Sequence, residues 1–466
     1  MAPRCGADLI FDYLNKEKVP YLFGAPGHGV MGLMAALPES QGNLKIVTVH
    51  HEQVAGFMAD AYYRVAHRPV ATFSSCGPGS ANIPIALANA MMDESAFLAI
   101  TGNVATSQFN RGTFQEAYRY HQAEFPATIR PYVKRSFQVV RTDMLPLALR
   151  QSFTLMTTGR PGPVHLDVPY NLFGEDAAGL EAPDPREWRA GIDARVGASP
   201  EAVRQALREL LAAARPVMLV GNGAVLAEAE EEIKAVAELL EIPVAYSPLG
   251  IGALDASHPL CLGSVGRNGA YPSNEATSMA DVLLALGAQF DDRATSAWLP
   301  GSTLEIPPTR LIQVELDPED LGRNYPVALG ITADVRTFLR QLLEAARQEG
   351  ARGRHGQWVR ETAAWKAEWA KYNDEHYRPD AQPINGEHVI RTLRKVFPRD
   401  GILAVDVGSH HTWVVSRWDA YQPRTVVQAW GYGAMGFGAA GALGAKLAAP
   451  DKPVLAIVGD GGVLMC

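Results

Sequence analysis

The sequence has little of what marks secreted, membrane-spanning or nucleic-acid-binding proteins. Its four cysteines lie far apart and form no CxxC pair, which argues against a disulfide framework or a cysteine zinc site. Acidic residues outnumber basic ones, with a net charge of -8, so no polyanionic partner such as nucleic acid is expected. No apolar run reaches the ~18 residues of a membrane span, and the N-terminus lacks the apolar run of a signal peptide. We therefore expect a cytoplasmic protein without a membrane partner.

The composition is that of an ordinary globular protein, with 47% hydrophobic and 20% charged residues. At roughly 150 residues per domain, a length of 466 residues predicts about three domains. A chain of this size buries a large core and needs no disulfide or structural metal to hold it.

One pattern occurs three times: a basic residue and a proline, a short apolar run, and a glycine turn. The apolar runs are residues 70–73, 217–220 and 454–458, and a helical pattern follows the first two, at residues 81–92 and 227–240. A buried strand, a tight turn and a helix make the βα unit of a parallel sheet. The sequence therefore predicts an α/β protein with three doubly wound, parallel-sheet domains.

Two segments without clear periodicity separate these patterns. Residues 174–200 are rich in glycine, proline, aspartate and alanine, and residues 349–384 are polar. We place the domains at residues 1–180, 190–345 and 370–466. The last one ends directly after a strand and a glycine turn, where the next helix should begin, so its C-terminal part is expected to be missing.

Glu52 lies between a predicted strand, residues 44–49, and a predicted helix, residues 54–63. One interpretation is a carboxylate that the positive end of a helix favours. The other is a half-buried acid that shares a proton with a ring nitrogen of a ligand. The residue alone leaves both open.

The turn Gly459-Asp460-Gly461-Gly462 follows the third apolar run. Asp-Gly alone is a common turn signal. At the carboxyl end of a buried parallel strand, however, glycines let a phosphate approach backbone N–H groups. An aspartate there can hold Mg²⁺ together with phosphate oxygens. We favour this phosphate–metal interpretation over a plain turn.

Two further segments are compatible with phosphate binding. Residues 431–436 match the dinucleotide pattern GxGxxG. Asp451 has the spacing of the acid that this pattern requires, but it precedes the next strand and does not end it, so a dinucleotide site is a weak interpretation. Ser409, His410 and His411 follow a predicted strand. They are credible donors to a phosphate, with a solvated loop as the equal alternative.

A series of motifs runs through almost the whole chain. In order, these are Phe23-Gly24-Ala25-Pro26-Gly27, His51-Glu52-Gln53, Gly77-Pro78-Gly79-Ser80-Ala81-Asn82, Phe114-Gln115-Glu116, Gly162-Pro163-Val164-His165-Leu166-Asp167-Val168-Pro169, Phe290-Asp291-Asp292-Arg293, Gly433-Ala434-Met435-Gly436-Phe437-Gly438 and Gly459-Asp460-Gly461. Each motif alone is weak evidence for any family. In this order and spacing, the chain resembles the thiamine-diphosphate (ThDP) dependent enzymes, and acetolactate synthase most closely.

The resemblance implies a catalytic role for Glu52. It matches the glutamate that hydrogen-bonds N1′ of the cofactor's aminopyrimidine and favours the tautomer whose 4′ nitrogen removes the thiazolium C2 proton. The cofactor then serves as the electron sink. Met435 matches the bulky residue that bends the cofactor, and the Gly433 carbonyl would hold its 4′ amino group, so the protein mainly positions reacting atoms. Phe114 and Gln115 would line the substrate side of C2.

The resemblance also implies a site for the diphosphate and its Mg²⁺. Asp460 matches the first Mg²⁺ ligand, whereas the second ligand in the family is an asparagine beyond the last residue of this sequence. The remaining implied cofactor contacts are Pro26, Asn82, Ser409, His410, His411, Gly459, Gly461 and Gly462. Because the family builds its active sites between subunits, a homodimer or homotetramer is implied.

This sequence departs from the family pattern at two places within its length. His28 stands where acetolactate synthases usually have glycine. Other family members place a polar active-site residue there, so His28 is a candidate for proton transfer to the substrate. A loop histidine with only local hydrogen bonds is the alternative. In the central part, residues 290–293 match the family motif, but residues 266–274 differ from the stretch that contacts flavin in the family. The sequence therefore does not decide whether FAD binds.

The function that the resemblance implies is decarboxylation of a 2-oxo acid such as pyruvate with ThDP and Mg²⁺. The acyl carbanion equivalent is then transferred to a second carbonyl. His28 keeps open a lyase, C–C hydrolase or acyltransferase that acts on another aldehyde or ketone donor. An interpretation of a different class is a non-catalytic nucleotide-binding or regulatory protein on this fold, which would have no use for the proton relay at Glu52.

Overall fold

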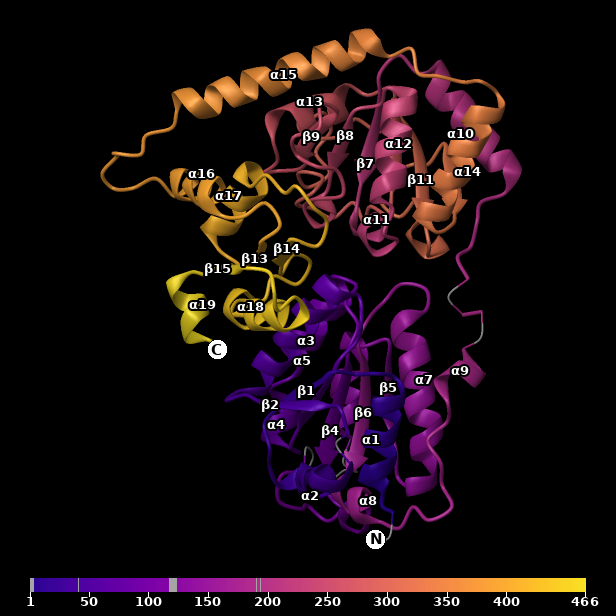
Figure 1. Cartoon of the computed structure of the whole chain (residues 1–466), viewed down its shortest axis with the longest axis vertical. Helices are drawn as coiled ribbons and strands as arrows, with labels where there is room; N and C mark the ends of the chain where they lie inside the picture. The colour runs from indigo at the N-terminus through magenta and orange to yellow at the C-terminus, as the bar shows by residue number, and fades with distance from the viewer. Residues whose placement is uncertain (1–3, 41, 117–123, 190, 193) are drawn as a thin grey trace. The chain divides into compact units, whose positions relative to one another are not determined.

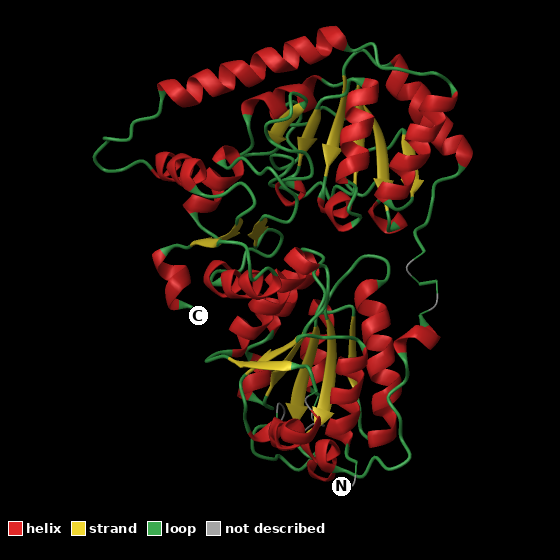
Figure 2. Ribbon diagram, in the orientation of Figure 1, coloured by secondary structure: helices red, strands yellow, loops and turns green. Residues whose placement is uncertain are grey.

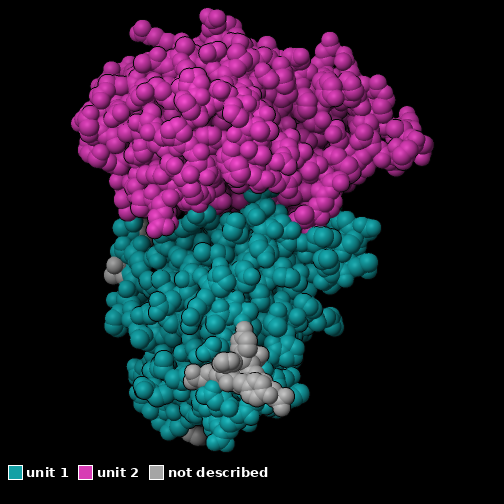
Figure 3. All heavy atoms as spheres, turned by 180° about the vertical axis from the view of Figure 1, so that it is seen from behind, with its two compact units in different colours: residues 1–194, 429–466 teal, residues 195–428 magenta. Residues whose placement is uncertain are grey.

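The computed structural model describes residues 4–40, 42–116, 124–189, 191–192 and 194–466. They form two compact units, coloured in Figure 3. Unit 1 comprises Met1–Ala194 with Ala429–Cys466, and unit 2 comprises Arg195–Gln428. The predicted third domain, residues 370–466, thus contributes to both units. The predicted start of the second domain, residue 190, lies outside the described residues.

Three sheets of parallel strands confirm the predicted α/β class; their strands are the arrows in Figure 2. The first has the order β2-β1-β3-β4-β6-β5 (Lys45–Thr48, Tyr21–Gly24, Ala71–Ser74, Leu98–Asn103, Val164–Pro169, Arg135–Gln138). The second has the order β12-β11-β10-β7-β8-β9 (Leu329–Thr332, Arg310–Glu315, Val282–Leu286, Pro216–Val220, Val244–Tyr246, Cys261–Ser264). The third is small, with the order β14-β13-β15 (Val426–Gln428, Ile402–Val405, Val454–Ile457). Neighbouring strands run parallel throughout the first two sheets and in the β13–β14 pair.

Helices cover the six-stranded sheet of unit 1, and most of them are labelled in Figure 1. They are α1 Gly6–Lys16, α2 Met31–Ser40, α3 Glu52–Ala66, α4 Pro78–Ala81, α5 Pro84–Met92, α6 Phe125–Ile129, α7 Leu145–Thr157, α8 Tyr170–Gly174, α9 Pro185–Trp188, α18 Phe437–Ala448 and α19 Asp460–Leu464. Every residue of β3, β4 and β6 is buried. This burial explains why β3 and β4 carry mostly apolar or small residues, since parallel sheets are covered on both faces; β6 is the exception, because it buries His165 and Asp167.

Helices α3 and α18 pack closely although they lie far apart in the sequence. The rings of Phe57 and Phe437 meet edge to face, with centroids 5.7 Å apart. A Cβ atom added to Gly444 would lie 2.1 Å from the backbone oxygen of Met58. Only glycine permits this approach, because a methyl group at that distance would overlap the oxygen. The packing fixes the start of α18, and with it the preceding glycine segment, beside the first turns of α3.

Unit 2 is built on the second sheet and on the β13–β14 pair. Its helices are α10 Pro200–Ala212, α11 Asn222–Leu226, α12 Glu230–Leu240, α13 Tyr271–Met279, α14 Val335–Gln348, α15 Gly356–Glu375, α16 Gly386–Val396 and α17 Ser409–Arg417. Trp358 at the start of α15 joins the apolar core around β7 and β10. Its indole N–H donates to the backbone oxygen of Pro216 at 3.0 Å, so the long helix α15 is attached to the sheet at its N-terminal end.

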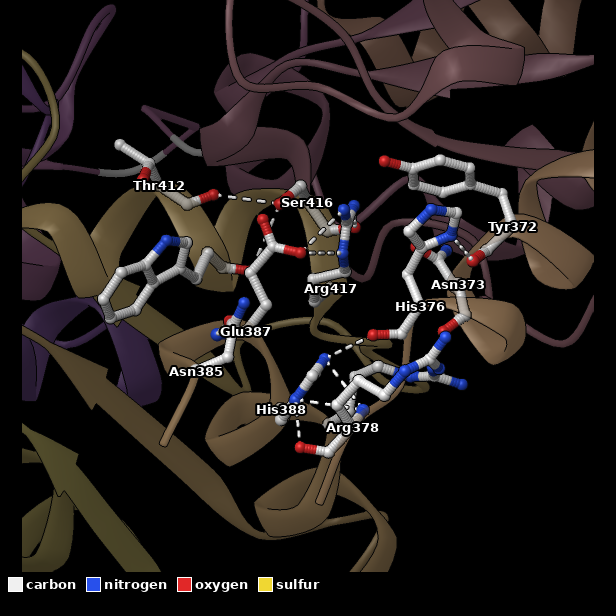
Figure 4. Close-up of polar contacts among 12 residues, drawn as sticks. Tyr372, Asn373, His376, Arg378, Asn385, Glu387, His388, Thr412, Ser416 and Arg417 are labelled. Atoms are coloured by element: carbon white, nitrogen blue, oxygen red, sulfur yellow. Dashed lines mark hydrogen bonds and ion pairs between the residues drawn. The ribbon is translucent and has the colours of Figure 1, made fainter. Parts of the chain in front are cut away.

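Polar contacts hold the segment that leads from α15 to α17, as Figure 4 shows. The two ring nitrogens of His388 lie 2.9 Å from the backbone oxygen of Arg378 and 2.7 Å from that of His376. Arg417 at the end of α17 pairs with Glu387 of α16 at 3.0 Å. Helix α17 begins at Ser409, so these contacts orient one of the predicted phosphate-binding segments.

Several element boundaries differ from the predicted ones. The helix predicted at residues 81–92 begins only at Pro84, and α4 precedes it after a short break. Proline is favoured in the first turn of a helix, where its missing N–H is not needed. The helix predicted at residues 227–240 begins only at Glu230, as α12, and the short helix α11 precedes the predicted range. In the part of the chain that the structure describes, no helix is long and apolar enough to cross a bilayer.

Candidate active site

Glu52 is the first residue of α3, immediately after the loop that follows β2. His51 caps the helix, because its Nδ1 accepts a hydrogen bond from the backbone N–H of Gln53 at 3.2 Å. The Glu52 side chain is half-buried, whereas Gln53 next to it is buried. The carboxylate therefore lies at the carboxyl edge of the sheet, where ligands of parallel α/β proteins bind.

Two neighbours from the Gly77–Asn82 motif hold the Glu52 carboxylate. The side-chain amide of Asn82 donates to Oε2 of Glu52 at 2.9 Å. A Cβ atom added to Gly79 would lie 2.9 Å from Oε1 of Glu52 and 3.2 Å from Cβ of Ser75. Asn82 thus orients the carboxylate through one oxygen, and the absence of a side chain at Gly79 leaves room at the other. This arrangement fits an acid that presents one oxygen to a ring nitrogen.

The segment with Gly433 and Met435 comes to the same region of unit 1. Gln53 donates from its side-chain amide to the backbone oxygen of Met435 at 3.4 Å. Gly433 and Gly436 have φ angles of 69° and 91°, in the left-handed region that favours glycine. Among the described residues, no atom beyond its chain neighbours lies within 4 Å of a Cβ added to Gly433, and the Met435 side chain is 37% exposed. A carbonyl and a bulky apolar side chain are therefore available to a ligand.

The glycine turn that ends β15 lies against Met435. A Cβ atom added to Gly461 would lie 3.1 Å from Cε of Met435. Gly459 precedes α19, and Asp460 is the first, exposed residue of that helix. Among the described residues, no group of three or more histidine, cysteine, aspartate or glutamate side chains is arranged to hold a metal. A lone aspartate suits Mg²⁺ when phosphate oxygens and waters complete the coordination shell.

Ser409, His410 and His411 form the first turn of α17 in unit 2. His411 is buried, and its Nε2 lies 2.7 Å from Oε1 of Gln428. Burial lowers the pKa of His411 to about 4, which keeps the ring neutral near pH 7. Ser409 is exposed and His410 half-buried, so these two are better placed than His411 to donate to a ligand.

The predicted substrate-side residues occupy loops of unit 1. Phe114 is 81% exposed. Gln115 has a φ of 65° and its Oε1 lies 3.5 Å from Sγ of Cys76, so it is held beside the Gly77–Asn82 motif. Pro26 is exposed after β1. His28 begins a short helical turn, with its ring centroid 5.2 Å from that of Tyr170.

Sequence reasoning missed the residues that join these segments. Asp93 accepts hydrogen bonds from the backbone N–H groups of Trp430 and Gly431 at 2.9 and 2.7 Å. Ser75 Oγ accepts one from the N–H of Gly29 at 3.0 Å. Ser75 stands two residues before the Gly77–Asn82 motif, so its position in the sequence could have marked it as part of the site. No local pattern marks Asp93 as the acceptor of these two backbone N–H groups, which lie more than 300 residues away in the sequence.

The residues in unit 1 fit the groups of ThDP that the resemblance assigns to them. The Glu52 carboxylate is half-buried and oriented by Asn82, Gly433 has an unobstructed backbone, and Met435 is exposed next to the Gly461 turn. By contrast, Asp451 lies in the turn before β15. It therefore cannot serve as the acid that ends the strand after a dinucleotide-binding GxGxxG.

Comparisons with known proteins agree with this geometry. Three family models match: "Thiamine pyrophosphate enzyme, N-terminal TPP binding domain" at residues 4–124, the central domain at residues 203–342, and the C-terminal TPP binding domain at residues 406–466.

Similar full-length relatives carry the name acetolactate synthase. The probable acetolactate synthase large subunit of Methanococcus aeolicus is 31% identical, over 99% of this chain and 76% of the relative. The acetolactate synthase isozyme 3 large subunit of Escherichia coli K12 is 32% identical, over 99% and 78%. The Corynebacterium glutamicum large subunit is 33% identical, over 98% and 70%. With its three matching domains and the Glu52 site, this chain belongs to the thiamine-diphosphate-dependent enzymes and is an acetolactate synthase-like carboligase.

Proposed function

We propose that the enzyme uses ThDP and Mg²⁺ to decarboxylate a 2-oxo acid such as pyruvate and to join the remaining acyl group to a second carbonyl. The observation that carries the proposal is the half-buried Glu52 carboxylate, which Asn82 orients through one oxygen and which packs through the other against Gly79. When bound, the cofactor supplies an electron sink for the electron pair released as the bond to CO₂ breaks.

The chain's own residues then position and exchange protons. Glu52 would hold a proton at the pyrimidine N1′ of bound ThDP, and Asn82 keeps the carboxylate oriented for that contact. The Gly433 backbone oxygen would accept a hydrogen bond from the cofactor's 4′ amino group. The exposed Met435 side chain, held next to Gly461, would provide an apolar contact to the cofactor. Preorganised contacts of this kind lower the barrier by fixing the reacting atoms in place.

We also propose contacts for the diphosphate and its metal. Asp460 is the proposed Mg²⁺ ligand, with the backbone of Gly459, Gly461 and Gly462 next to the phosphates. Ser409 and His410 are the proposed side-chain donors, and His411 supports the loop from inside. Pro26, Phe114 and Gln115 are proposed to line the cofactor and substrate side of the site.

The proposed assembly is a homodimer or homotetramer with active sites between subunits. Apolar side chains of α18 and of the segment before it are exposed in the single chain: Tyr432 at 47%, Met435 at 37% and Leu443 at 56%. Exposed apolar area of this kind favours burial against another protein surface. The four cysteines are all free, which supports a cytoplasmic location.

The test is release of ¹⁴CO₂ from [1-¹⁴C]pyruvate with ThDP and Mg²⁺, together with calorimetric titration of the cofactor. Glu52→Gln should lower CO₂ release by at least a hundredfold, since loss of a general acid–base group commonly costs 10²–10⁴ in rate. The matched control is Glu361→Gln, an exposed position on α15, and it should retain full activity. Equal activity of Glu52→Gln and the control would refute the proposed role.

Activity on an aldehyde or ketone donor without CO₂ release would instead favour the lyase, hydrolase or acyltransferase alternative. Absence of both ThDP binding and turnover, with Glu52→Gln indistinguishable from the parent in every assay, would favour the non-catalytic alternative.

A further inference from the structure

Cys76 is enclosed at the carboxyl edge of the first sheet, two residues after β3 ends. Only 1% of its surface is exposed. A Cβ atom added to Gly29 would lie 2.5 Å from the backbone nitrogen of Cys76 and 3.0 Å from its Sγ. A Cβ atom added to Gly77 would lie 2.6 Å from the backbone oxygen of Gln115. The two glycines leave no space for side chains, so Cys76 and Gln115 are held closely beside each other.

The Cys76 thiol donates a hydrogen bond to the side chain of Gln115. The Sγ atom of Cys76 lies 3.5 Å from Oε1 of Gln115. Burial raises the pKa of the Cys76 thiol, so the sulfur keeps its proton near pH 7 and acts as a donor. A donor must face the oxygen of an amide and not its N–H₂ group. The contact therefore determines which way round the Gln115 amide lies.

The N–H₂ group of the same amide is available to a ligand. Within the described part of the chain, Nε2 of Gln115 has no hydrogen-bond partner, and it is not sealed from solvent. The residue is half-buried, and its φ of 65° lies in a region that few residues other than glycine adopt. Such a backbone conformation persists where the surroundings determine it. The contacts with Gly77 and Cys76 therefore fix both the backbone and the side chain of Gln115.

One short loop connects this amide to Glu52. Gly77 packs against Gln115, and a Cβ atom added to Gly79, two residues further on, would lie 2.9 Å from Oε1 of Glu52. Two residues span at most about 7 Å. Gln115 and Glu52 therefore border the same region of unit 1, and the loop that orients the carboxylate also carries the thiol that orients the amide.

We propose that Cys76 is a positioning residue, whose thiol turns the Gln115 amide so that its N–H₂ group donates to an oxygen of the 2-oxo acid. This role rests on the proposed function, which supplies the substrate. Cys76 itself contacts neither substrate nor cofactor. In the opposite orientation the amide oxygen would face the substrate oxygens, and two acceptors form no hydrogen bond. Without the thiol, both orientations are populated and part of the binding is lost.

Two variants of Cys76 test the role through the kinetics of ¹⁴CO₂ release from [1-¹⁴C]pyruvate. Cys76→Ala removes the donor, whereas Cys76→Ser keeps one in a side chain of similar size. Cys76→Ala should raise KM for pyruvate about fivefold, as expected for one neutral hydrogen bond, with a smaller change in kcat. Cys76→Ser should stay close to the parent. The control Cys261→Ala removes another buried thiol, in unit 2, and should leave KM unchanged.

A double-mutant cycle shows whether the thiol acts through the amide. In a Gln115→Ala background, Cys76→Ala should leave KM nearly unchanged, because the group that it positions is gone. A merely structural thiol would have its full effect in both backgrounds. The contact also has a signature that needs no turnover. The infrared S–H stretching band that Cys76→Ser removes should move to higher frequency in Gln115→Ala, since donating a hydrogen bond weakens the S–H bond.

The outcomes separate this role from the proposed function. An unchanged KM in folded Cys76→Ala, an equal effect in both backgrounds, or an S–H band that Gln115→Ala does not move would overturn the role of Cys76 and leave the proposed function intact. Should Cys76→Ala fail to fold, the S–H band decides. No CO₂ release by the parent from pyruvate or any other 2-oxo acid tested would overturn the proposed function, and the substrate contact with it.

Discussion

The carboxylate of Asp93 accepts a hydrogen bond from the backbone N–H of Gly431 at 2.7 Å, across 338 positions of sequence. The same carboxylate also binds the N–H of Trp430 and pairs with Arg64 at 3.0 Å. Asp93 is buried, and burial raises its pKa in spite of the nearby Arg64 guanidinium. These contacts hold the segment that leads to Gly433 and Met435 against the end of α5.

We therefore expect Asp93→Ala to destabilise unit 1 and to loosen the cofactor site. Removing one partner of a buried charged network typically costs roughly 3–5 kcal/mol, and two backbone N–H groups lose their acceptor. Urea unfolding should show a loss of about this size, with weaker ThDP binding by calorimetry. Asp143→Ala, which removes the exposed partner of Arg141, should leave the free energy of unfolding essentially unchanged, because solvent screens exposed ion pairs. Equal effects of the two variants would contradict this account.

The close approach of α3 and α18 gives a second prediction. Gly444→Ala would place a methyl group 2.1 Å from the backbone oxygen of Met58, so the helices must separate. Overpacking of this kind costs roughly 1–3 kcal/mol. Gly356→Ala is the matched control, because the nearest atom to its Cβ is 3.5 Å away. Alanine has the higher helix propensity, so that variant should be neutral or up to about 1 kcal/mol more stable. Thermal and urea unfolding of both variants test whether the first lowers the free energy of unfolding while the second leaves it unchanged or raises it.

Local sequence was sufficient to predict the fold class and the position of Glu52. Short apolar runs that end in glycine turns specify parallel strands, because both faces of such a sheet are covered. Glu52 stands between one such strand and a helical pattern, so its place at the carboxyl edge of the sheet follows from the neighbouring residues. The glycine at position 79 was visible as part of a motif, although its contact with Glu52 was not.

Contacts between distant segments could not be read from the sequence. The residues around Asp93 indicate only the end of a helix, whereas its function in the fold depends on backbone groups near residue 430. His411 was predicted to face a phosphate, but it lies on the buried face of α17 with Val414 and Val415. That three- and four-residue spacing is typical of a buried helix face and was available as a signal.

Gly79 offers a test of the Glu52 site that should spare the fold. In Gly79→Ala, the added methyl group would lie 2.9 Å from Oε1 of Glu52, so the flexible carboxylate must move away from its contact with the cofactor. CO₂ release should fall by tenfold or more, which corresponds to about 1.4 kcal/mol of lost transition-state stabilisation. The unfolding midpoint should stay close to that of the parent, because the displaced atom ends a side chain. A large loss of stability with unchanged activity per folded molecule would show that Gly79 serves packing alone.

Buried Asp167 and His165 share the hydroxyl of Thr101, which lies 3.0 Å from Oδ1 of Asp167 and 2.7 Å from Nε2 of His165. Burial raises the pKa of Asp167 from 3.8 to about 6 and lowers the pKa of His165 from 6.5 to about 3. Between about pH 4 and 6, folded Asp167 holds a proton that the unfolded chain has released, so its contribution to stability falls as the pH rises. In the same window the unfolded chain protonates His165 and the folded protein does not, so that contribution rises with pH.

The two slopes oppose each other, and single variants should expose them. Relative to the parent, Asp167→Asn should gain stability by up to about 1.4 kcal/mol per pH unit as the pH rises from about 4.5 to 6. His165→Gln should lose stability relative to the parent at a similar rate over the same range. The measurement is the free energy of unfolding in urea at several pH values for the three proteins. Curves that run parallel would mean that neither group changes its protonation on folding in this range, and the Thr101 network would then carry no linked proton.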